Sequence, residues 1–375
     1  MEALILSCST GGGHNAAAYA AAEALTFRGH NAKVMDPYSL IGERVAKAVG
    51  GTYVRMVQIS PSLFGIVYKI GNTYRRLPIK SPVYRVNGHM AKRLNKYFAE
   101  NKTDVVLCTH IFPAEMLTYM RNCGMNIPKV IFVATDYTCV PFTEETDCDY
   151  YVVPSQDLND EYIRRGIPEE KLVIGGIPVK RAFREGLSKA EAREALGLDS
   201  KSEYIILSGG SMGAGKLRTA IRVLEPYLSP EDKRLIVLCG NNSGLYNSLY
   251  DKYSANSRIM LLPSTNDMPT YLRACDIFIG KPGGLSSTEC ASARVPTIFI
   301  SPIPGCETYN CNFFARRGMA LTVKNIRRGL ISSIKRIESE AAVAKMNKQQ
   351  EKYISGRGAE DIAELCESIC TKYDR

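Results

Sequence analysis

The chain has no tryptophan, only four histidines among 375 residues, and no long apolar run. Because no stretch reaches 18 consecutive apolar residues, we expect no transmembrane helix. The first residues have no basic start and turn polar and glycine-rich by Gly11, so they predict a strand and not a signal peptide. Twelve cysteines are present without any CxxC spacing, which argues against a zinc site or a disulfide framework. Free thiols in this number favour a reducing compartment, the cytoplasm.

Acidic residues are missing from residues 44–96, which contain eleven Lys or Arg. This positive charge accounts for the whole formal net charge of +10, so the rest of the chain is close to neutral. Aromatic and apolar residues lie among these charges. A basic segment with an aromatic and apolar face is typical of binding to an anionic membrane surface. An ordinary solvated surface and a nucleic-acid interface are the alternatives, although no nucleic-acid motif accompanies the segment.

Strands and helices alternate along the chain, and this alternation predicts an α/β fold with parallel sheets. The length favours two domains, and the pattern completes one sheet near residues 175–179 before it restarts after Lys201. The final segment is helical and charged. We expect strands at 3–9, 104–109, 129–135, 150–153, 172–174, 204–207, 234–239, 258–262, 276–279 and 296–300.

Three glycine-rich loops fall between a strand and a helix, at residues 11–14, 209–215 and 281–284. Exposed N–H groups and the helix dipole favour an anion at such a turn, so together the loops predict a nucleotide diphosphate ligand. Glycines that only permit tight turns are the alternative.

Two short motifs resemble the binding sites of other protein classes, a P-loop and a metal-binding DxD motif. Residues 210–216 nearly form a P-loop, but Leu217 stands where a P-loop needs a hydroxyl for magnesium. Asp147 and Asp149 have the DxD spacing of metal-dependent glycosyltransferases of another fold. We interpret this pair as part of an ordinary exposed loop without a metal-binding role, because such short matches are common by chance.

His14 is the main catalytic candidate, because it opens a helix on the side of the sheet where ligands bind. The dipole disfavours its charged form, and a neutral imidazole accepts a proton from a hydroxyl. Asp136 follows a strand and is predicted either to orient His14 or to act on the acceptor. His110 follows another strand on the same side, whereas His30 and His89 are predicted to be ordinary surface positions.

Three further polar residues are candidates for the donor side. Glu289 lies in the helix after the third glycine loop, where a carboxylate accepts both hydroxyls of a ribose. Glu307 and Asn310 follow a strand, where sugar hydroxyls need bidentate partners. Each residue alone is also compatible with a solvated side chain.

Six motifs occur in order along the chain: Gly11-Gly12-Gly13-His14-x-Ala16, Ala134-Thr135-Asp136, Gly175-Gly176-Ile177-Pro178-Val179, Gly209-Gly210-Ser211-Met212-Gly213, Leu238-Cys239-Gly240-Asn241-Asn242 and Lys281-Pro282-Gly283-Gly284…Glu289. From residue 3 to about 320 this set resembles the monogalactosyldiacylglycerol synthase and diacylglycerol glucosyltransferase family. It is more distantly similar to the transferase that adds N-acetylglucosamine to the lipid intermediate of peptidoglycan.

The resemblance implies a GT-B fold, in which two Rossmann-like domains face each other across a cleft. It implies inverting transfer of a hexose from a UDP-sugar to diacylglycerol or glycosyl-diacylglycerol, with no required metal. We expect an acceptor- and membrane-binding domain at 1–179, a UDP-sugar-binding domain at 180–335, and helices at 336–375 that pack back toward the first domain. Many members have Gln where Cys306 stands, so UDP-glucose and UDP-galactose both remain open.

The expected site has three parts. The catalytic residues are His14 and Asp136. The membrane and acceptor residues are Phe64, Tyr68, Arg75, Arg76, Lys80 and Arg85. The glycine loops and the resemblance together give the UDP-sugar side as Gly13, Gly210, Ser211, Met212, Gly213, Gly240, Asn241, Lys281, Gly283, Gly284, Leu285, Ser286, Glu289, Glu307 and Asn310.

The expected partners are diacylglycerol, a UDP-hexose and anionic membrane lipids, without nucleic acid. The expected location is the cytoplasm, peripheral on the inner face of the cell membrane. Alternatives are a transferase for a polyprenyl-linked acceptor, a UDP-sugar epimerase on the same fold, a magnesium-dependent P-loop NTPase, and a non-catalytic module that binds RNA or an anionic surface.

Overall fold

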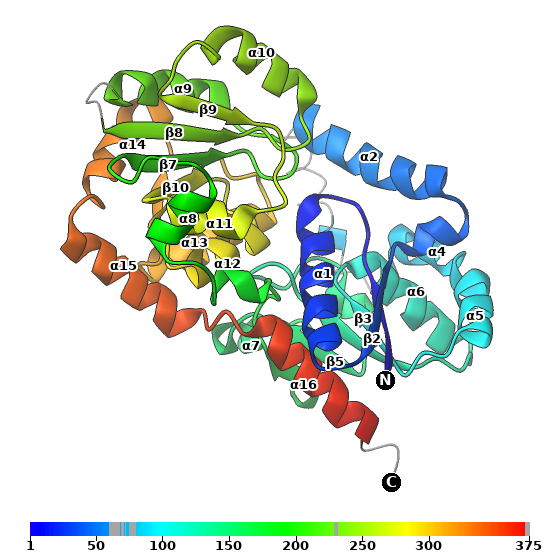
Figure 1. The fold of residues 1–375 in the computed structure, drawn as a ribbon. Helices are drawn as coiled ribbons and strands as arrows, with labels where there is room; N and C mark the ends of the chain where they lie inside the picture. Colours follow the sequence, from blue (N-terminus) through cyan, green and yellow to red (C-terminus); the bar gives the residue numbers. More distant parts are fainter. Residues whose placement is uncertain (60–67, 69–70, 72, 75–79, 229–231, 372–375) are drawn as a thin grey trace. The chain divides into compact units, whose positions relative to one another are not determined.

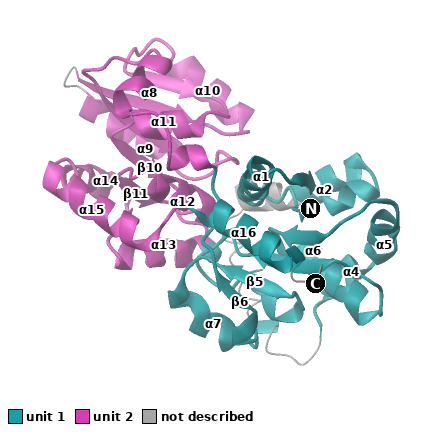
Figure 2. Cartoon of the chain, turned by 60° about the horizontal axis from the view of Figure 1, so that its bottom comes forward, with its two compact units in different colours: residues 1–180, 304–306, 357–375 teal, residues 181–303, 307–356 magenta. Residues whose placement is uncertain are grey.

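The protein forms two compact units (Figure 2). A computed structural model describes residues 1–375 except 60–67, 69–70, 72, 75–79, 229–231 and 372–375. Unit 1 comprises residues 1–180, 304–306 and 357–375, and unit 2 comprises residues 181–303 and 307–356. The final helices are therefore divided between the units, since α15 (Glu340–Tyr353) belongs to unit 2 and α16 (Gly358–Thr371) to unit 1.

Unit 1 is built on a parallel sheet in the order β2-β1-β3-β4-β5-β6. Its strands are β1 (Glu2–Leu6), β2 (Asn31–Met35), β3 (Val105–Cys108), β4 (Lys129–Val133), β5 (Tyr150–Val153) and β6 (Leu172–Ile174). The fully buried β3 and the buried part of β4 after Lys129 read as short apolar runs, as expected for a sheet covered on both faces. The edge strand β2 is half-exposed, which explains why the apolar pattern missed it.

The helices of unit 1 pack on this sheet, and α1 and α16 share one core with it (Figure 1). Ala18 and Leu25 of α1 meet Ile362 and Cys366 of α16 over Ile131 of the sheet. The helices are α1 (Gly12–Phe27), α2 (Glu43–Ile59), α4 (Pro82–Gly88), α5 (Ala91–Glu100), α6 (Ile111–Asn122) and α7 (Asn159–Ile163), with 3₁₀ turns at Pro37–Leu40, Thr143–Glu145, Gln156–Leu158 and Glu169–Lys171.

A polar clamp also fixes α16 to unit 1. The carboxylate of Glu367 accepts hydrogen bonds from Arg28 at 2.9 and 2.6 Å and pairs with Nε2 of His30 at 2.8 Å. Because Arg28 holds the carboxylate charge, the pKa of Glu367 falls to about 2. His30, predicted to be an ordinary surface residue, therefore helps to anchor the C-terminal helix.

Unit 2 is built on a second parallel sheet in the order β12-β11-β10-β7-β8-β9. Its strands are β7 (Glu203–Ser208), β8 (Lys233–Leu238), β9 (Ile259–Leu262), β10 (Ile277–Gly280), β11 (Thr297–Ile300) and β12 (Leu321–Val323). The two parallel sheets confirm the predicted α/β class. The short edge strand β12 was not predicted, because three residues carry too little pattern.

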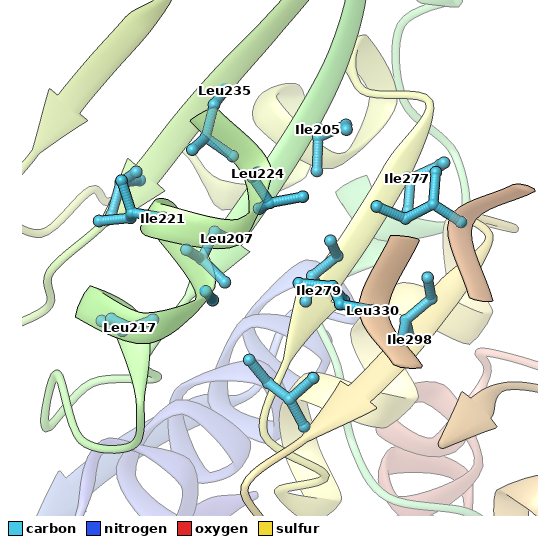
Figure 3. Close-up of a cluster of buried hydrophobic side chains, with 14 of the residues drawn as sticks. Ile205, Leu207, Leu217, Ile221, Leu224, Leu235, Ile277, Ile279, Ile298 and Leu330 are labelled. Carbon is cyan, nitrogen blue, oxygen red and sulfur yellow. The ribbon is translucent and has the colours of Figure 1, made fainter. Parts of the chain in front are cut away.

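One core of unit 2 lies between this sheet and α9 (Leu217–Leu224) and α14 (Ile326–Lys335) (Figure 3). Leu217, Ile221 and Leu224 lie at helical spacing and pack against Leu207 of β7. The other helices are α8 (Lys189–Ala195), α10 (Ser243–Tyr253), α11 (Met268–Ala274), α12 (Gly284–Ser292), α13 (Cys306–Arg316) and α15, with 3₁₀ turns at Arg181–Phe183 and Glu225–Leu228.

The order of strands reverses once in each sheet, between β1 and β3 in unit 1 and between β7 and β10 in unit 2. In open parallel sheets, ligands bind outside the carboxyl ends of the strands at such a reversal. Each unit therefore has one favoured place for a ligand. Within the part of the chain that the structure describes, we find no helix long and apolar enough to cross a membrane.

Candidate active site

His14 lies at the strand reversal of unit 1, in the first turn of α1 directly after β1. Its Nδ1 is 2.8 Å from the carbonyl oxygen of Thr109, just beyond β3. The same nitrogen is 2.9 Å from Oγ1 of Thr135, just beyond β4. Three neighbouring strands thus bring their carboxyl ends together around one imidazole.

These contacts determine which ring nitrogen of His14 carries the proton. A carbonyl oxygen only accepts, so Nδ1 must be the N–H, and the Thr135 hydroxyl oxygen accepts from the same N–H. The neutral ring then carries its lone pair on Nε2. Burial lowers the pKa of His14, although the bond to Thr109 opposes this shift. The side chain is therefore a neutral base at pH 7, as the sequence predicts, with burial as the main cause.

His110 is the second imidazole of this site. It caps α6, where its Nδ1 accepts from the backbone N–H of Phe112 at 3.2 Å. Its ring meets that of His14 edge to face, with centroids 4.6 Å apart. Burial lowers the pKa of His110 well below the usual value, and a proton on the neighbouring His14 would lower it further, so His110 is neutral too.

An apolar cavity of about 340 Å³ adjoins His14 and His110. Its walls include Ile111 and Phe112 of α6 and Phe132 of β4. Asp136 and Tyr68 also line it, so two further candidates lie at this cavity. Whether Asp136 orients His14 or acts on the acceptor stays a prediction, because the contacts described for Nδ1 of His14 are those with Thr109 and Thr135.

Phe142, in the wall of the same cavity, has a left-handed backbone with φ of 72°. This conformation raises the free energy of a residue with a side chain, and it occurs most often at functional sites. Sequence reasoning missed Phe142, because a strained φ leaves no compositional signal.

In unit 2, two glycine loops interlock beyond β7 and β8. Gly213 has a φ of 56°, and a Cβ added there would lie 2.0 Å from the carbonyl oxygen of Cys239. Gly240 has a φ of 59°, and its Cβ would lie 2.4 Å from the carbonyl oxygen of Gly210. Asn241 donates its N–H to the carbonyl oxygen of Ser211 at 2.8 Å. The glycines are therefore required by close backbone approach, beyond merely allowing a turn.

The first of these loops leads into α9 in a way that does not suit a P-loop. Leu217 begins α9 and is 2 % exposed in the core, at the position where a P-loop presents a magnesium-binding hydroxyl. Of the other predicted residues, Met212 is half-buried, whereas Ser211 and Asn241 are exposed.

Beyond β10, the third glycine loop leads into α12, which begins at Gly284. Lys281 precedes it and forms a buried ion pair with Glu307, with Nζ 3.2 Å from Oε1. Thus two residues predicted separately lie in direct contact. Gly283, Ser286 and Glu289 are half-buried, and Leu285 and Asn310 are buried. The N–H groups at the start of α12 provide a place for an anion.

Comparisons with known proteins agree with this architecture. The family model described as monogalactosyldiacylglycerol (MGDG) synthase matches residues 14–179, and that of the glycosyltransferase family 28 C-terminal domain matches residues 204–366. The processive diacylglycerol beta-glucosyltransferase of Bacillus licheniformis is 27 % identical, over 98 % of this chain and 96 % of the relative. Residues 14–179 thus belong to the monogalactosyldiacylglycerol synthase family and residues 204–366 form a glycosyltransferase family 28 C-terminal domain, so the chain is a glycosyltransferase.

Solved structures place this glycosyltransferase in the GT-B fold. MurG of Acinetobacter baumannii superposes with a TM-score of 0.63 at 16 % identity, covering 98 % of this chain and all (100 %) of MurG. The UDP-GlcNAc 2-epimerase of Neisseria meningitidis, bound to UDP-GlcNAc, gives a TM-score of 0.62 at 14 % identity, covering 97 % of this chain and 99 % of the epimerase. At these identities the likeness shows the fold alone.

The basic segment of this glycosyltransferase begins in α2, beside the loop between β1 and α1 that precedes His14. A Cβ added at Gly50 would lie 2.4 Å from the carbonyl oxygen of Ser9, so glycine lets α2 approach the loop after β1. Lys80 donates to the carbonyl oxygen of Glu145 at 2.7 Å, whereas Arg85 is exposed. The predicted acceptor residues Phe64, Arg75 and Arg76 lie outside the described residues.

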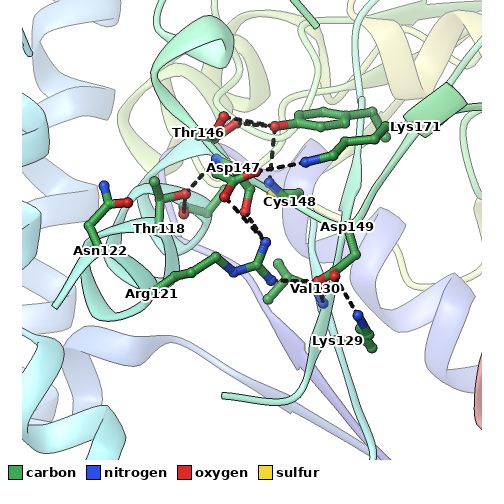
Figure 4. Close-up of polar contacts among 12 residues, drawn as sticks. Thr118, Arg121, Asn122, Lys129, Val130, Thr146, Asp147, Cys148, Asp149 and Lys171 are labelled. Carbon is green, nitrogen blue, oxygen red and sulfur yellow. Dashed lines mark hydrogen bonds and ion pairs between the residues drawn. The ribbon is translucent and has the colours of Figure 1, made fainter. Parts of the chain in front are cut away.

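The DxD pair of this glycosyltransferase is part of an ion-pair network in unit 1 (Figure 4). Asp149 accepts from Arg121 at 2.5 Å, from Lys129 at 2.9 Å and from the N–H of Val130 at 2.9 Å. Asp147 pairs with Lys171 at 2.7 Å and with Arg121 at 3.6 Å. The pair connects α6 to β4 and to the 3₁₀ turn Glu169–Lys171 before β6, so it has a larger structural role than the ordinary loop expected from the sequence.

We predict that Asp149→Asn destabilises unit 1 without impairing catalysis. Burial raises the pKa of Asp149, but hydrogen bonds from Val130, Lys129 and Arg121 outweigh burial and lower it. The carboxylate therefore stabilises the fold above its unfolded pKa of about 3.9, and this contribution is lost as pH falls through the lower folded pKa. At pH 7 we expect a loss of about 1–3 kcal/mol and a lower Tm, measured by calorimetry.

The exposed Asp160 provides the control, since Asp160→Asn is expected to leave Tm unchanged. A loss of kcat in Asp149→Asn at unchanged Tm would contradict the structural role.

Proposed function

We propose that the protein transfers a hexose from a UDP-sugar to the free hydroxyl of diacylglycerol, with inversion at the anomeric carbon. The observation that carries this proposal is a neutral histidine, His14, held by Thr109 and Thr135 at an apolar cavity. A base beside an apolar cavity suits an acceptor with a hydroxyl and fatty chains. The name of the Bacillus licheniformis relative supports the same acceptor class.

On the acceptor side, Nε2 of His14 takes the hydroxyl proton as the oxygen attacks the anomeric carbon. A new C–O bond forms on one face of the sugar, while the bond to the diphosphate oxygen breaks on the opposite face. The proton ends on His14, and the electron pair leaves with UDP. Thr109 and Thr135 fix the ring during this step, so that Nε2 faces the acceptor.

On the donor side, we place the diphosphate at the glycine loops of unit 2, against the start of α12 at Gly283–Gly284 and beside the loop of residues 210–213. The N–H groups of Gly210 and Gly213 donate within that loop, to Oγ of Ser208 at 3.1 Å and to the carbonyl oxygen of Gly210 at 3.0 Å, so they hold its shape. Preoriented N–H groups and the dipole of α12 stabilise the charge that develops on the leaving UDP. We therefore propose that turnover needs no metal. The buried Lys281–Glu307 pair lies at the same sheet edge and belongs to the donor site.

We further propose that the basic segment holds the enzyme on anionic lipids at the inner face of the cell membrane. Arg85 of α4 and Lys92, Arg93 and Lys96 of α5 are exposed, and Val86 beside Arg85 is 64 % exposed. Each such charge is worth about 1 kcal/mol near an anionic bilayer, and the apolar side chain adds insertion.

We predict that Ile111→Glu selectively weakens use of the lipid acceptor. Ile111 is half-buried in the cavity wall at the start of α6, where an acidic residue suits the helix dipole. A carboxylate there places charge against fatty chains, so we expect KM for diacylglycerol to rise about tenfold or more. Affinity for UDP-glucose, measured by calorimetry, stays unchanged.

The exposed Ile163 of α7 is the matched control, and Ile163→Glu is expected to behave like wild type. An unchanged KM in Ile111→Glu would place the acceptor elsewhere.

The proposed function is tested by supplying diacylglycerol with UDP-glucose or UDP-galactose in separate reactions containing EDTA. UDP release and glycolipid formation are followed on vesicles with and without phosphatidylglycerol. We expect lipid-dependent turnover that is faster on the anionic vesicles and falls with salt. Turnover only with a polyprenyl-linked acceptor would refute the lipid assignment, and its abolition by EDTA would refute the metal-free mechanism.

A further inference from the structure

The buried ion pair of Lys281 and Glu307 is the most unusual polar feature of unit 2. The two side chains are only 8 % and 11 % exposed, and Nζ lies 3.2 Å from Oε1. The other carboxylate oxygen, Oε2, accepts the N–H of Ile303 at 2.7 Å. A buried pair contributes little net stability, because desolvation of both charges offsets their attraction. Since the pair lies beyond the strand reversal, where ligands bind, a role in ligand binding explains it better than a role in stability.

The stem of Lys281 runs beside the first glycine loop of unit 2. A Cβ added at Gly210 would lie 3.7 Å from Cε of Lys281, and one added at Gly215 would lie 3.7 Å from Cδ and from Cγ. One side chain thus extends from the loop proposed to hold the diphosphate to the carboxylate of Glu307.

Ser301, beyond β11, adds independent evidence for a ligand here. Its φ of 51° is left-handed, which is strained for serine. Its Oγ is buried and, within the described part of the chain, has no hydrogen-bond partner. Its Cβ lies 3.6 Å from the position of a Cβ added at Gly215. A strained residue with an unmatched hydroxyl beside this loop is typical of a site completed by a ligand.

We propose that Lys281 is a positioning residue that holds the Glu307 carboxylate where it accepts hydroxyls of the donor hexose. A carboxylate offers about four acceptor positions, and Lys281 and Ile303 occupy two of them. The remaining positions suit a bidentate contact with two sugar hydroxyls. This inference rests on the proposed function and assigns Lys281 to recognition of the sugar, acting through Glu307, instead of direct contact with the diphosphate.

The test compares binding of UDP with binding of UDP-glucose by calorimetry, which requires no lipid acceptor. In Lys281→Met we expect Kd for UDP to stay within about twofold, whereas the ratio of Kd for UDP-glucose to Kd for UDP rises about tenfold. Glu307→Gln should raise the same ratio. The double variant K281M/E307Q should be no worse than E307Q, because both changes remove one interaction. Lys281→Arg, which keeps the charge, should restore part of the loss.

The exposed Lys345 of α15 supplies the control, and Lys345→Met should match wild type. An equal loss of UDP and UDP-glucose binding in Lys281→Met would show that Lys281 contacts the diphosphate and would overturn the inference. Unchanged binding of both ligands would overturn it as well. If Lys281→Met does not fold, K281M/E307Q and K281R carry the same comparison. A wild-type protein that binds neither ligand would instead refute the proposed function.

Discussion

Replacing His14 with alanine is expected to lower kcat by about 10²–10⁴-fold, while Kd for UDP stays unchanged. This decrease in kcat is the usual contribution of a positioned general base. Binding of UDP is unaffected because other residues of the site bind both substrates. UDP release in the presence of diacylglycerol measures kcat, and calorimetry measures Kd. Because His14 lies in unit 1 and the proposed diphosphate loops lie in unit 2, the two measurements separate chemistry from donor binding.

The pH dependence of the wild-type rate provides a second test of His14. Burial lowers the pKa of His14 from its usual value near 6.5, so the neutral base is fully present at pH 7. We expect kcat to be constant from about pH 7 to 8 and to fall only below the usual histidine pKa.

The control for His14→Ala is His89→Ala, since the exposed ring of His89 lies 3.1 Å from the carbonyl oxygen of Arg85. A loss of activity in His89→Ala equal to that in His14→Ala would contradict the assignment of His14 as the base.

The second large effect is expected from Gly213→Ala. The new Cβ would lie 2.0 Å from the carbonyl oxygen of Cys239 and 2.7 Å from Cβ of Asn242, on a backbone with φ of 56°. Since the backbone cannot yield cheaply, the loop must move. Its internal hydrogen bonds, such as that from the N–H of Gly213 to the carbonyl oxygen of Gly210 at 3.0 Å, then no longer hold it beside the proposed diphosphate position. Two lost charge-assisted hydrogen bonds of about 1.5–3 kcal/mol each correspond to at least about 100-fold weaker UDP binding.

Gly244 in α10 is a matched control, because an added Cβ there meets only Oδ1 of Asn242 at 3.8 Å. Gly244→Ala is therefore expected to keep wild-type affinity. If Gly213→Ala bound UDP as tightly as wild type, the diphosphate would have to lie away from this loop. Circular dichroism of both variants distinguishes a local loop movement from general unfolding.

The central strands of both sheets were predictable, and so were the edge strands β6 and β9, whereas the edge strands β2 and β12 were missed. β3 and β10 are buried along their length, as is β4 after Lys129, and all three read as short apolar runs. The edge strands β2 and β12 contact the sheet on one side only, and exposure dilutes their apolar signal. The division of the last helices is also a tertiary effect: Glu367 anchors α16 through Arg28, more than 300 residues earlier in the chain.

In the functional site, too, single residues could be predicted from the sequence, but contacts that depend on tertiary structure could not. His14 and the glycine loops are visible in sequence, because they stand between a strand and a helix. One partner of His14 is the hydroxyl of Thr135, but the other is the backbone carbonyl of Thr109, and no residue type encodes a carbonyl. Likewise, Lys281 and Glu307 were each predicted, but their contact depends on how β10 and β11 are placed side by side. The strained Ser301 has no sequence signal at all.

The most direct test of the account is the anomeric configuration of the product. Wild-type protein is incubated with UDP-glucose, whose sugar is α-linked, and diacylglycerol in anionic micelles with EDTA, and the glycolipid is examined by proton NMR. The account predicts a β-linked glucosyl-diacylglycerol that is not formed by His14→Ala. An α-linked product, or a β-linked product formed equally fast by His14→Ala, would contradict direct attack assisted by His14.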